Sequence, residues 1–422
     1  MDEEKDKPLP PLRADVDTIP VELEGRPAFV LHDQEGIAKE VLALSPEGMA
    51  LAAFLDGRRT AEQVRAELAE RLKVVLSEAK VREIAARIGK AGFLETADVR
   101  AERKRLLDEF FSSPVRRMAL KGAYPENLLE LASYLGKFLR DGKGPGKPLA
   151  ESPSVPLPPI GLVCPHIDLE RGGPAYAWSY QALSESPPPD LIVAVGVAHV
   201  SPNSPWVMTR KDYETPYGPM RASPELCEDI RNGLWYDPAD DEWVHRSEHS
   251  LEYQALWLKS LWRDKTPPWA PILTSSFERF CSDKPPSSIP AMEEAFLKIG
   301  AMLSERAKSR RILVLAAVDL AHVGPKFGDA LEPDAELGRK IEAEDRGSLE
   351  KAMALDADGF YLSGVGQGGW RKLCGLSALY TSLRWIKALG GAKAAGTLLS
   401  YGQAPDPMGG IVSFSSAVFR KG

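Results

Sequence analysis

Two histidines stand where apolar segments of the chain end. The apolar run 160–164 is followed by Pro165 and His166, and the run 191–196 leads to His199. Two short apolar runs about 30 residues apart, with a helical stretch between them, are typical of a βαβ unit with buried parallel strands. Because ligands of open parallel sheets bind at the carboxyl ends of the strands, we predict that His166 and His199 bind one metal ion there. The alternative is that each histidine only hydrogen-bonds a carbonyl at the end of its strand.

A third apolar run, 312–316, leads to Asp319 and His322. This run predicts another strand of the same sheet, so we expect both side chains at the same edge. We predict that they lie beside the metal, where a neutral His322 acts as proton donor or acceptor and Asp319 fixes its tautomer.

Cys374 is a candidate for a further metal ligand. It directly precedes a predicted helix over 376–388, and the dipole and free amides of a helix N-terminus stabilise a thiolate. We therefore expect this thiol to ionise more readily than a buried one, although a cysteine is more often a small core residue. Cys164 lies within an apolar run and is predicted to be such a core residue. The four cysteines are too few and too scattered for a disulfide scaffold.

Three further polar residues are candidates for the same pocket. Asp168 follows His166 by two positions, so both point to one face, and we predict an alternative ligand or a residue that orients a ligand. Glu248 and His249 begin a predicted helix over 247–261. They line the pocket or, alternatively, only cap the helix and add surface charge.

The composition excludes several classes of protein. The chain has 422 residues, 44% of them hydrophobic, which is enough for two or three domains. Its formal net charge of −7 gives no general attraction to nucleic acid or to an anionic membrane. No apolar stretch is long enough to span a bilayer and the charged N-terminus lacks a signal-peptide core, so we expect a cytoplasmic protein.

The chain divides into three predicted parts. Residues 1–19 are charged and rich in proline and are predicted to be a disordered tail. Residues 20–105 are predicted to form a small α+β domain. Residues 111–422 are predicted to form an α/β domain with a mostly parallel sheet flanked by helices. Its last two predicted strands are a parallel one at 397–399 and an antiparallel edge at 411–419.

The small domain resembles the peptide-binding PqqD-like family, whose fold is winged-helix-like. The resemblance rests on Leu55-Asp56-Gly57-Arg58-Arg59-Thr60, on the helix that Thr60 and Gln63 open with a capping box, and on Gly92-Phe93-Leu94. It implies a domain that binds a peptide, a partner protein or DNA. The alternative is an appendage that only packs or dimerises.

The larger domain resembles the Memo family, which in bacteria and archaea is the B component of the AmmeMemoRadiSam system. Each of the short stretches that carry the resemblance is weak alone, but their order and spacing along the chain make the combination specific. The stretches that carry it are Tyr124-Pro125, Pro165-His166, Gly196 to His199, Thr215-Pro216-Tyr217-Gly218, Glu248-His249-Ser250-Leu251-Glu252, Asp319 to Gly324, Asp345 and Leu373-Cys374-Gly375.

The Memo resemblance implies a fold like that of class III extradiol dioxygenases, whose non-heme iron is held by two histidines and a carboxylate. In Memo proteins the matching site has two histidines and a cysteine, which are His166, His199 and Cys374 here, and His322 matches the acid/base histidine of the dioxygenases. The resemblance also implies two protein partners, a radical SAM protein and an AMMECR-like protein of the same system.

The sequence departs from the Memo family beside these residues. Ile167-Asp168-Leu169 stands where the family commonly has Ala, Gly and Tyr, and Val200 stands where a second histidine is usual. Val318 and Leu320 replace the usual Ser and Phe before His322. These changes retain the ligands and alter the substrate pocket.

Three functional hypotheses follow. Two imidazoles and a thiolate with open positions suit Fe(II) and oxygen, while the thiolate adds affinity for Cu and Zn. We expect Fe(II) first, in a dioxygenase-like oxidoreductase that acts on a small or peptide-borne substrate with His322 as proton shuttle. The second hypothesis is a non-catalytic binding module that docks a partner through its N-terminal domain. The third is a Zn hydrolase, because the same ligands leave a position for a zinc-bound water.

Overall fold

A computed structural model of the protein describes residues 7–421 except positions 24, 34, 39, 156, 407 and 408. The chain forms two compact units, Met1–Ser112 and Ser113–Gly422. The division falls at the end of helix α4 (Ala97–Ser112), close to the predicted start of the larger domain at residue 111. Each unit has a hydrophobic core of its own.

Among the described residues, the first unit contains a three-stranded antiparallel sheet, in the order β1-β2-β3, and four helices. The remaining elements are β1 (Val16–Leu23), β2 (Arg26–Asp33), β3 (Leu42–Leu44), α1 (Pro46–Ala52), α2 (Ala61–Leu72) and α3 (Glu78–Ala91). Leu51, Val64 and Ile88 are fully buried where the helices pack together.

Local sequence signals account for the helix ends of this unit. The Thr60 hydroxyl accepts the N–H of Gln63, and the Gln63 side chain accepts the N–H of Thr60, so the predicted capping box opens α2. Gly92 ends α3 with a φ of 96°, and a side chain there would come within 3.0 Å of the Ala38 Cα. The likeness of this unit to PqqD-like domains stays a prediction.

The predicted disordered tail, 1–19, is wrong for the residues that can be checked. Residues 1–6 lie outside the described part of the chain. Leu12 forms a β-bridge, and strand β1 already begins at residue 16. Arg13 is buried and forms an ion pair with Asp33. A segment that reads as charged and Pro-rich is therefore anchored, because its charges and apolar side chains find partners in the small domain.

In the described part of the chain, the second unit is built on an eight-stranded sheet. The strand order is β11-β13-β5-β10-β6-β9-β7, and β12 also pairs with β13. The strands are β5 (Gly161–Cys164), β6 (Leu191–Val197), β7 (Trp206–Met208), β9 (Trp269–Thr274), β10 (Ile312–Ala317), β11 (Asp319–Val323), β12 (Ala394–Asp406) and β13 (Gly410–Lys421). A further short parallel pair is formed by β4 (Val115–Arg116) and β8 (Asp212–Tyr213).

The centre of the sheet is parallel and its margins are antiparallel. β5, β10, β6 and β9 run parallel and are buried along their whole length, as their continuous apolar runs predict. β7 is antiparallel to β9, and β13 is antiparallel to β5, β11 and β12. The predicted α/β fold, with a mostly parallel sheet flanked by helices, is confirmed.

Two predictions for the last strands need correction. Residues 397–399 lie in β12, which is antiparallel rather than parallel. Residues 411–419 lie in β13, which is antiparallel as predicted but is an interior strand rather than an edge. Ser413 and Ser416 make this strand look half-exposed in the sequence, yet both hydroxyls are buried and hydrogen-bonded inside the protein.

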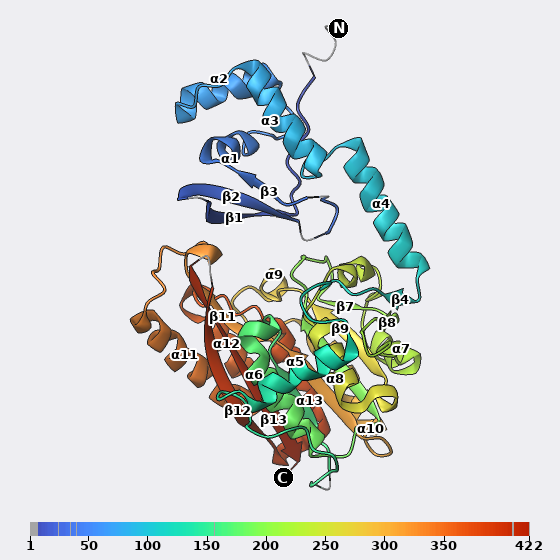
Figure 1. Ribbon diagram of the computed structural model, residues 1–422. Coiled ribbons are helices and arrows are strands. Elements are labelled where there is room, and N and C mark those ends of the chain that lie inside the picture. The colour runs from blue at the N-terminus through green and yellow to red at the C-terminus, as the bar shows by residue number, and fades with distance from the viewer. Residues whose placement is uncertain are drawn as a thin grey trace. The chain divides into compact units, whose positions relative to one another are not determined.

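Helices cover both faces of the sheet (Figure 1). One face packs against α5, α6 and α8, and the other against α7, α10, α12 and α13. Alternate strand residues serve the two cores: Val193 lies in one and Ile192 in the other. The helices are α5 (Leu128–Arg140), α6 (Leu169–Ser184), α7 (Pro224–Asn232), α8 (Glu252–Trp262), α9 (Glu278–Cys281), α10 (Pro290–Arg306), α11 (Ala335–Met353), α12 (Ala357–Val365) and α13 (Leu376–Gly390). Within the described residues, none of the helices has the length and apolarity needed to cross a membrane.

Between β10 and β11 the chain crosses the carboxyl end of β5. β10 pairs with β5 on one side, whereas β11 pairs with β13, the neighbour of β5 on its other side. At the crossing, Val318 donates its N–H to the Cys164 carbonyl at 2.8 Å. His322 therefore lies on β11, beyond the crossing, and not directly at the end of the strand that the run 312–316 forms.

Substitution of Gly196 in β6 would test how closely this strand approaches the turn that carries Glu248 and His249. A Cβ there would lie 2.6 Å from the Ser250 Oγ and 2.9 Å from the Leu251 Cγ. We expect Gly196→Ala to lower the free energy of unfolding by about 1–3 kcal/mol, because overpacking strains a buried core. Urea denaturation followed by circular dichroism measures the change.

Gly347→Ala is the matched control. Gly347 is exposed on α11, and a Cβ there would meet no atom within 4 Å. We expect it to raise the stability by up to about 1 kcal/mol, because alanine favours a helix interior. An unchanged denaturation midpoint for Gly196→Ala would contradict the close approach of β6 to this turn.

Candidate metal centre

Three imidazoles meet at the carboxyl edge of the parallel strands. His166 follows β5, His199 follows β6, and His249 lies in the turn before α8. One ring nitrogen of each lies within 4.8 Å of those of the other two, so the group could hold a metal ion. The His199 and His249 rings are stacked with their centroids 4.8 Å apart, and the His166 ring meets both edge-on.

The His249 turn is held to β6 by Ser250. The buried Ser250 hydroxyl accepts the N–H of Val197 at 3.1 Å and donates to the Val197 carbonyl at 3.0 Å. These bonds fix the end of the strand from which His199 extends. In the sequence, the only sign of this role is the position of Ser250 next to His249.

Glu248 joins two of the histidines. Its side chain is only 3% exposed, and its carboxylate accepts the N–H of His199 at 2.9 Å and that of Ser250 at 2.7 Å. One carboxylate oxygen lies 3.0 Å from Nδ1 of His199, and the other lies 3.3 Å from Nδ1 of His249. A carboxylate bonded to Nδ1 leaves Nε2 for a metal, which is the usual arrangement of ligating histidines. Glu248 therefore lies within the site and is not a surface charge.

The three histidines differ in protonation. Burial lowers the pKa of His166 and of His249 to about 4, so both are neutral at pH 7. Burial also acts to lower the pKa of His199, but the charge of Glu248 outweighs it and the pKa is raised. His199 in turn holds the pKa of Glu248 well below its usual range despite the burial of that carboxyl. Near neutral pH a metal ion would therefore compete with a proton at His199 rather than at the other two.

His166 is fixed by the segment that crosses β5. Its Nδ1 lies 3.0 Å from the Ala317 carbonyl, so Nδ1 carries the hydrogen and Nε2 has the free lone pair. Its backbone N–H donates to the Asp319 carboxylate at 3.0 Å, and the second Asp319 oxygen lies 3.6 Å from Nε2. Asp319 thus lies beside the candidate metal position, where burial raises the pKa of its carboxyl.

Cys374 reaches the same site from the loop before α13. Its Sγ lies 3.4 Å from Nε2 of His166 and 3.8 Å from the Asp319 carbonyl. A nitrogen and a sulfur that share one tetrahedral ion lie about 3.6 Å apart, so the distance to His166 fits a common ion. The expectation that this thiol ionises readily is wrong for the metal-free protein, because burial and Asp319 raise the pKa of Cys374 well above its ordinary value.

His322 lies on β11 beside these groups. Its Nδ1 lies 3.1 Å from the Leu320 carbonyl, and its backbone N–H donates to the Arg371 carbonyl at 2.8 Å. The tautomer is therefore fixed by Leu320 and not, as predicted, by Asp319. Burial lowers the pKa of His322 to about 4, so its Nε2 is an unprotonated acceptor at pH 7.

Two other predicted residues have structural roles. Asp168 is the N-cap of α6, where it accepts the Arg171 N–H at 3.1 Å and binds its guanidinium at 2.6 Å. These bonds make it a helix cap and not an alternative ligand. Cys164 is buried in β5, where burial raises its pKa to about 12, as a core residue requires.

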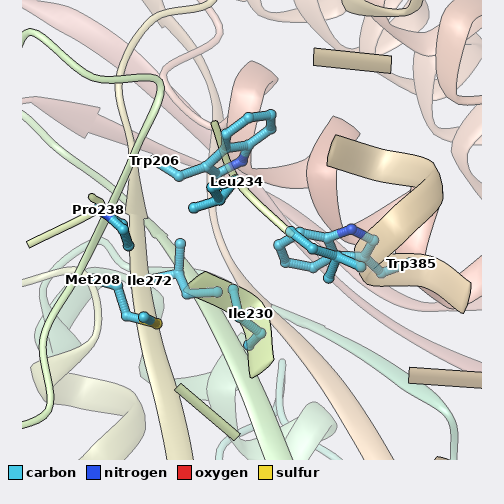
Figure 2. A pocket seen from close by; sticks show the side chains of 8 residues that line it. Trp206, Met208, Ile230, Leu234, Pro238, Ile272 and Trp385 are labelled. Carbon is cyan, nitrogen blue, oxygen red and sulfur yellow. The ribbon is translucent and has the colours of Figure 1, made fainter. Parts of the chain in front are cut away.

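A separate pocket contains none of the site residues, all of which are described (Figure 2). Its walls are apolar and belong to the core between the sheet and helices α7, α10 and α13. The lining residues are Trp206, Met208, Ile230, Leu234, Pro238, Ile272, Ile299 and Trp385. They offer no acid, base, imidazole or thiol, so the pocket does not compete with the histidine site as a centre of chemistry.

Residues 116–418 match the family model of Memo-like protein. The chain belongs to the Memo-like family. The matched region contains every predicted site residue, from His166 to Cys374, and it begins after the end of the first unit. The family therefore accounts for the second unit alone.

Relatives of this Memo-like protein share about a quarter of its sequence. A MEMO1 family protein of Aquifex aeolicus is 25% identical over 305 residues, which are 71% of this chain and 73% of that protein. One of Nitrosopumilus maritimus is 26% identical over 297 residues, 70% and 94% of the two chains. One of Thermus thermophilus is 28% identical over 294 residues, 69% and 80% of the two chains. A crystal structure of an uncharacterised protein from Escherichia coli K12 matches with a TM-score of 0.33 and 18% identity over 61% of this chain and 98% of that one, values at which the likeness carries no argument.

Glu248→Gln tests whether this carboxylate sets the protonation of His199. In the metal-free variant the negative charge is gone while burial remains, so we expect the pKa of His199 to fall below its ordinary 6.5. NMR titration of the imidazole resonances measures it. Glu214→Gln, which removes a carboxylate that pairs with Arg117 outside the site, is the control. A His199 titration that is the same in both variants would rule out Glu248 as the cause.

Proposed function

We propose that this Memo-like protein is a metal-dependent, dioxygenase-like oxidoreductase with His166, His199 and Cys374 as its metal ligands. The observation that carries the proposal is the approach of imidazole and thiol groups from distant segments at one edge of the sheet, with 3.4 Å between Nε2 of His166 and Sγ of Cys374. In His166 and His199 the Nδ1 atoms are bonded to the protein, which leaves Nε2 for an ion.

His249 adds a nitrogen to the ligand set that the family resemblance implies. Its ring nitrogen belongs to the same group as those of His166 and His199, and Glu248 orients it as it orients His199. The three imidazoles form the group whose nitrogens lie together, and Cys374 is not part of that group; its thiol lies beside His166. A thiolate and imidazoles suit Fe(II), Cu and Zn, of which we propose Fe(II) first, with Cu or Zn as alternatives.

An iron ion with an open coordination position would supply oxygen binding and one-electron chemistry. The residues of the chain would then bind the ion, orient its ligands and transfer protons. Asp319 and the Ala317 carbonyl fix His166, and Glu248 fixes His199. His322, whose Nδ1–H is bonded to Leu320, presents Nε2 as the base that takes a proton from a bound substrate.

The substrate we propose is small or peptide-borne. The first unit, with its resemblance to PqqD-like domains, would bind a peptide or a partner protein. A radical SAM protein and an AMMECR-like protein of the same system are the partners that the family resemblance implies. None of these roles requires nucleic acid or a membrane, which fits the formal net charge of −7.

Metal reconstitution tests the ligand set. Protein purified anaerobically and loaded with Fe(II), Cu or Zn should retain about one ion per chain, and His166→Ala should lose most of it because the imidazole that faces Cys374 is gone. Metal analysis and oxygen uptake are the measurements. His32→Ala, which removes an exposed histidine of β2, should keep the metal.

The outcomes separate the candidate functions. Metal content of the wild-type level in His166→Ala would defeat the proposal. Activity restored by Zn but not by Fe(II) would select a hydrolase. Folded wild-type protein that retains no metal and consumes no oxygen would select a binding module.

The proton-accepting role of His322 can be tested with 4-nitrocatechol, whose visible absorption reports its ionisation. We expect the Fe(II)-loaded protein to bind it deprotonated, and His322→Gln to shift that deprotonation to higher pH because its proton acceptor is lost. Phe327→Leu removes the ring that packs edge-on against His322 and leaves the base, so it is the control. Identical pH profiles for His322→Gln and the wild type, at equal metal content, would remove His322 from the mechanism.

A further inference from the structure

The loop that carries Cys374 is strained. Gln367 and Lys372 have φ values of 54° and 48°, which are unfavourable for residues other than glycine. Gly368 and Gly369 between them also have positive φ values, 75° and 64°. A segment of this kind keeps one conformation only when its surroundings hold it there.

Arg371 provides such an anchor. Its side chain is 2% exposed, and its guanidinium donates to the Asp345 carboxylate at 2.5 Å, to the Ser348 hydroxyl at 2.9 Å and to the Ser363 carbonyl at 2.9 Å. The Glu344 carboxylate also lies 3.3 Å from its Nε, and a planar guanidinium with partners on all three nitrogens is fixed in orientation as well as in position. Its backbone carbonyl also accepts the N–H of His322 at 2.8 Å.

Asp345 on α11 connects this anchor to β11. Its side chain is 0% exposed, and its second oxygen accepts the hydroxyls of Ser413 at 2.5 Å and Tyr401 at 3.0 Å. The Ser413 hydroxyl in turn accepts the N–H of Ala321, the neighbour of His322, at 2.9 Å. One buried carboxylate therefore binds the loop of Cys374 directly and is linked to the strand of His322 through the Ser413 hydroxyl.

Stability alone does not explain such a network. Taking an arginine and an aspartate out of water carries a large desolvation cost, and apolar side chains of similar volume often give a protein that is as stable or more stable. A buried, fully bonded pair does, however, select one arrangement of the segments it joins. The segments joined here carry two groups of the candidate site.

We propose that Arg371 and Asp345 are positioning residues that hold the Cys374 thiol and the His322 ring in one fixed arrangement at the metal site. This inference rests on the proposed function for the role of Cys374 as a ligand. Arg371 acts on Cys374 through the loop, and Asp345 acts on His322 through Ser413 and Ala321.

Arg371→Lys tests whether Arg371 positions Cys374. This variant keeps the positive charge and loses the planar guanidinium with its hydrogen bonds. In Co(II)-loaded protein the near-ultraviolet absorption from thiolate to cobalt reports whether Cys374 is bound. We expect that band to weaken several-fold and the Kd for Co(II) to rise about 10- to 100-fold. Cys374→Ser defines the spectrum without the thiolate.

Tyr401→Phe is the matched control. It removes the hydrogen bonds that the Tyr401 hydroxyl makes with Asp345 and Gln403 and leaves the Arg371–Asp345 and Ser413–Ala321 bonds in place. We expect it to keep the cobalt band and the affinity of the wild type. A loss of both in Tyr401→Phe would mean that any damage to this carboxylate, and not the anchoring of the loop, disturbs the site.

The rate of thiol alkylation measures the accessibility of Cys374 without a metal. Cys374 is half-buried, whereas Cys164, Cys227 and Cys281 are buried, so iodoacetamide can reach Cys374 more easily than the other three thiols. Mass spectrometry of the labelled peptide should show faster labelling in Arg371→Lys and an unchanged rate in Tyr401→Phe. Ser413→Ala tests whether Asp345 positions His322, and it can be measured even if Arg371→Lys does not fold. This variant keeps the Arg371–Asp345 pair and removes the hydroxyl that links Asp345 to Ala321. We expect it to shift the 4-nitrocatechol profile as His322→Gln does and to leave the cobalt band intact.

The outcomes separate this inference from the proposed function. Folded Arg371→Lys with the cobalt band, affinity and labelling rate of the wild type overturns the positioning role. A wild-type 4-nitrocatechol profile in Ser413→Ala overturns it as well, provided that His322→Gln shifts that profile. A wild-type protein without a thiolate band instead removes Cys374 from the proposed ligands. In that case the labelling rates alone decide whether Arg371 holds the loop.

Discussion

The passage of the chain from β10 to β11 across the carboxyl end of β5 is the constraint on which the site depends. It carries Asp319 to the backbone of His166 and offers the Asp319 carbonyl to Gly375 N–H at 3.2 Å, directly after Cys374. Gly375 has no room for a side chain, because a Cβ there would lie 2.5 Å from that carbonyl oxygen. A histidine and a thiol from segments 208 positions apart in the chain thus contact the same short turn.

Buried charge organises the rest of the site. Glu248 loses most of its hydration, and the N–H groups of His199 and Ser250 together with the two imidazoles replace it. The same rule applies to Arg371 and Asp345, each of which uses several hydrogen bonds in the core. In both places a carboxylate determines the position or protonation of a group that could act chemically, and in neither place is it exposed to water.

Membership of the Memo-like family applies to the second unit, because the match begins at residue 116. The first unit, Met1–Ser112, is a separate addition with its own sheet and core. The histidine cluster is compatible with several metals, since imidazole nitrogens bind Zn, Cu and Fe alike.

By itself the sequence determined the parallel centre of the sheet, because strands buried on both faces must be continuously apolar, and it placed His166 and His199 where those runs break. It also determined local features such as the capping box at Thr60 and the glycine end of α3, which depend only on neighbouring residues. Only the tertiary structure decided the direction of β12, the interior place of β13 and the meeting of Glu248 with two histidines. It also decided that Leu320 rather than Asp319 holds the His322 ring and that burial suppresses ionisation of Cys374. These properties depend on distances and dehydration between residues far apart in the chain, which no local pattern of residue types contains.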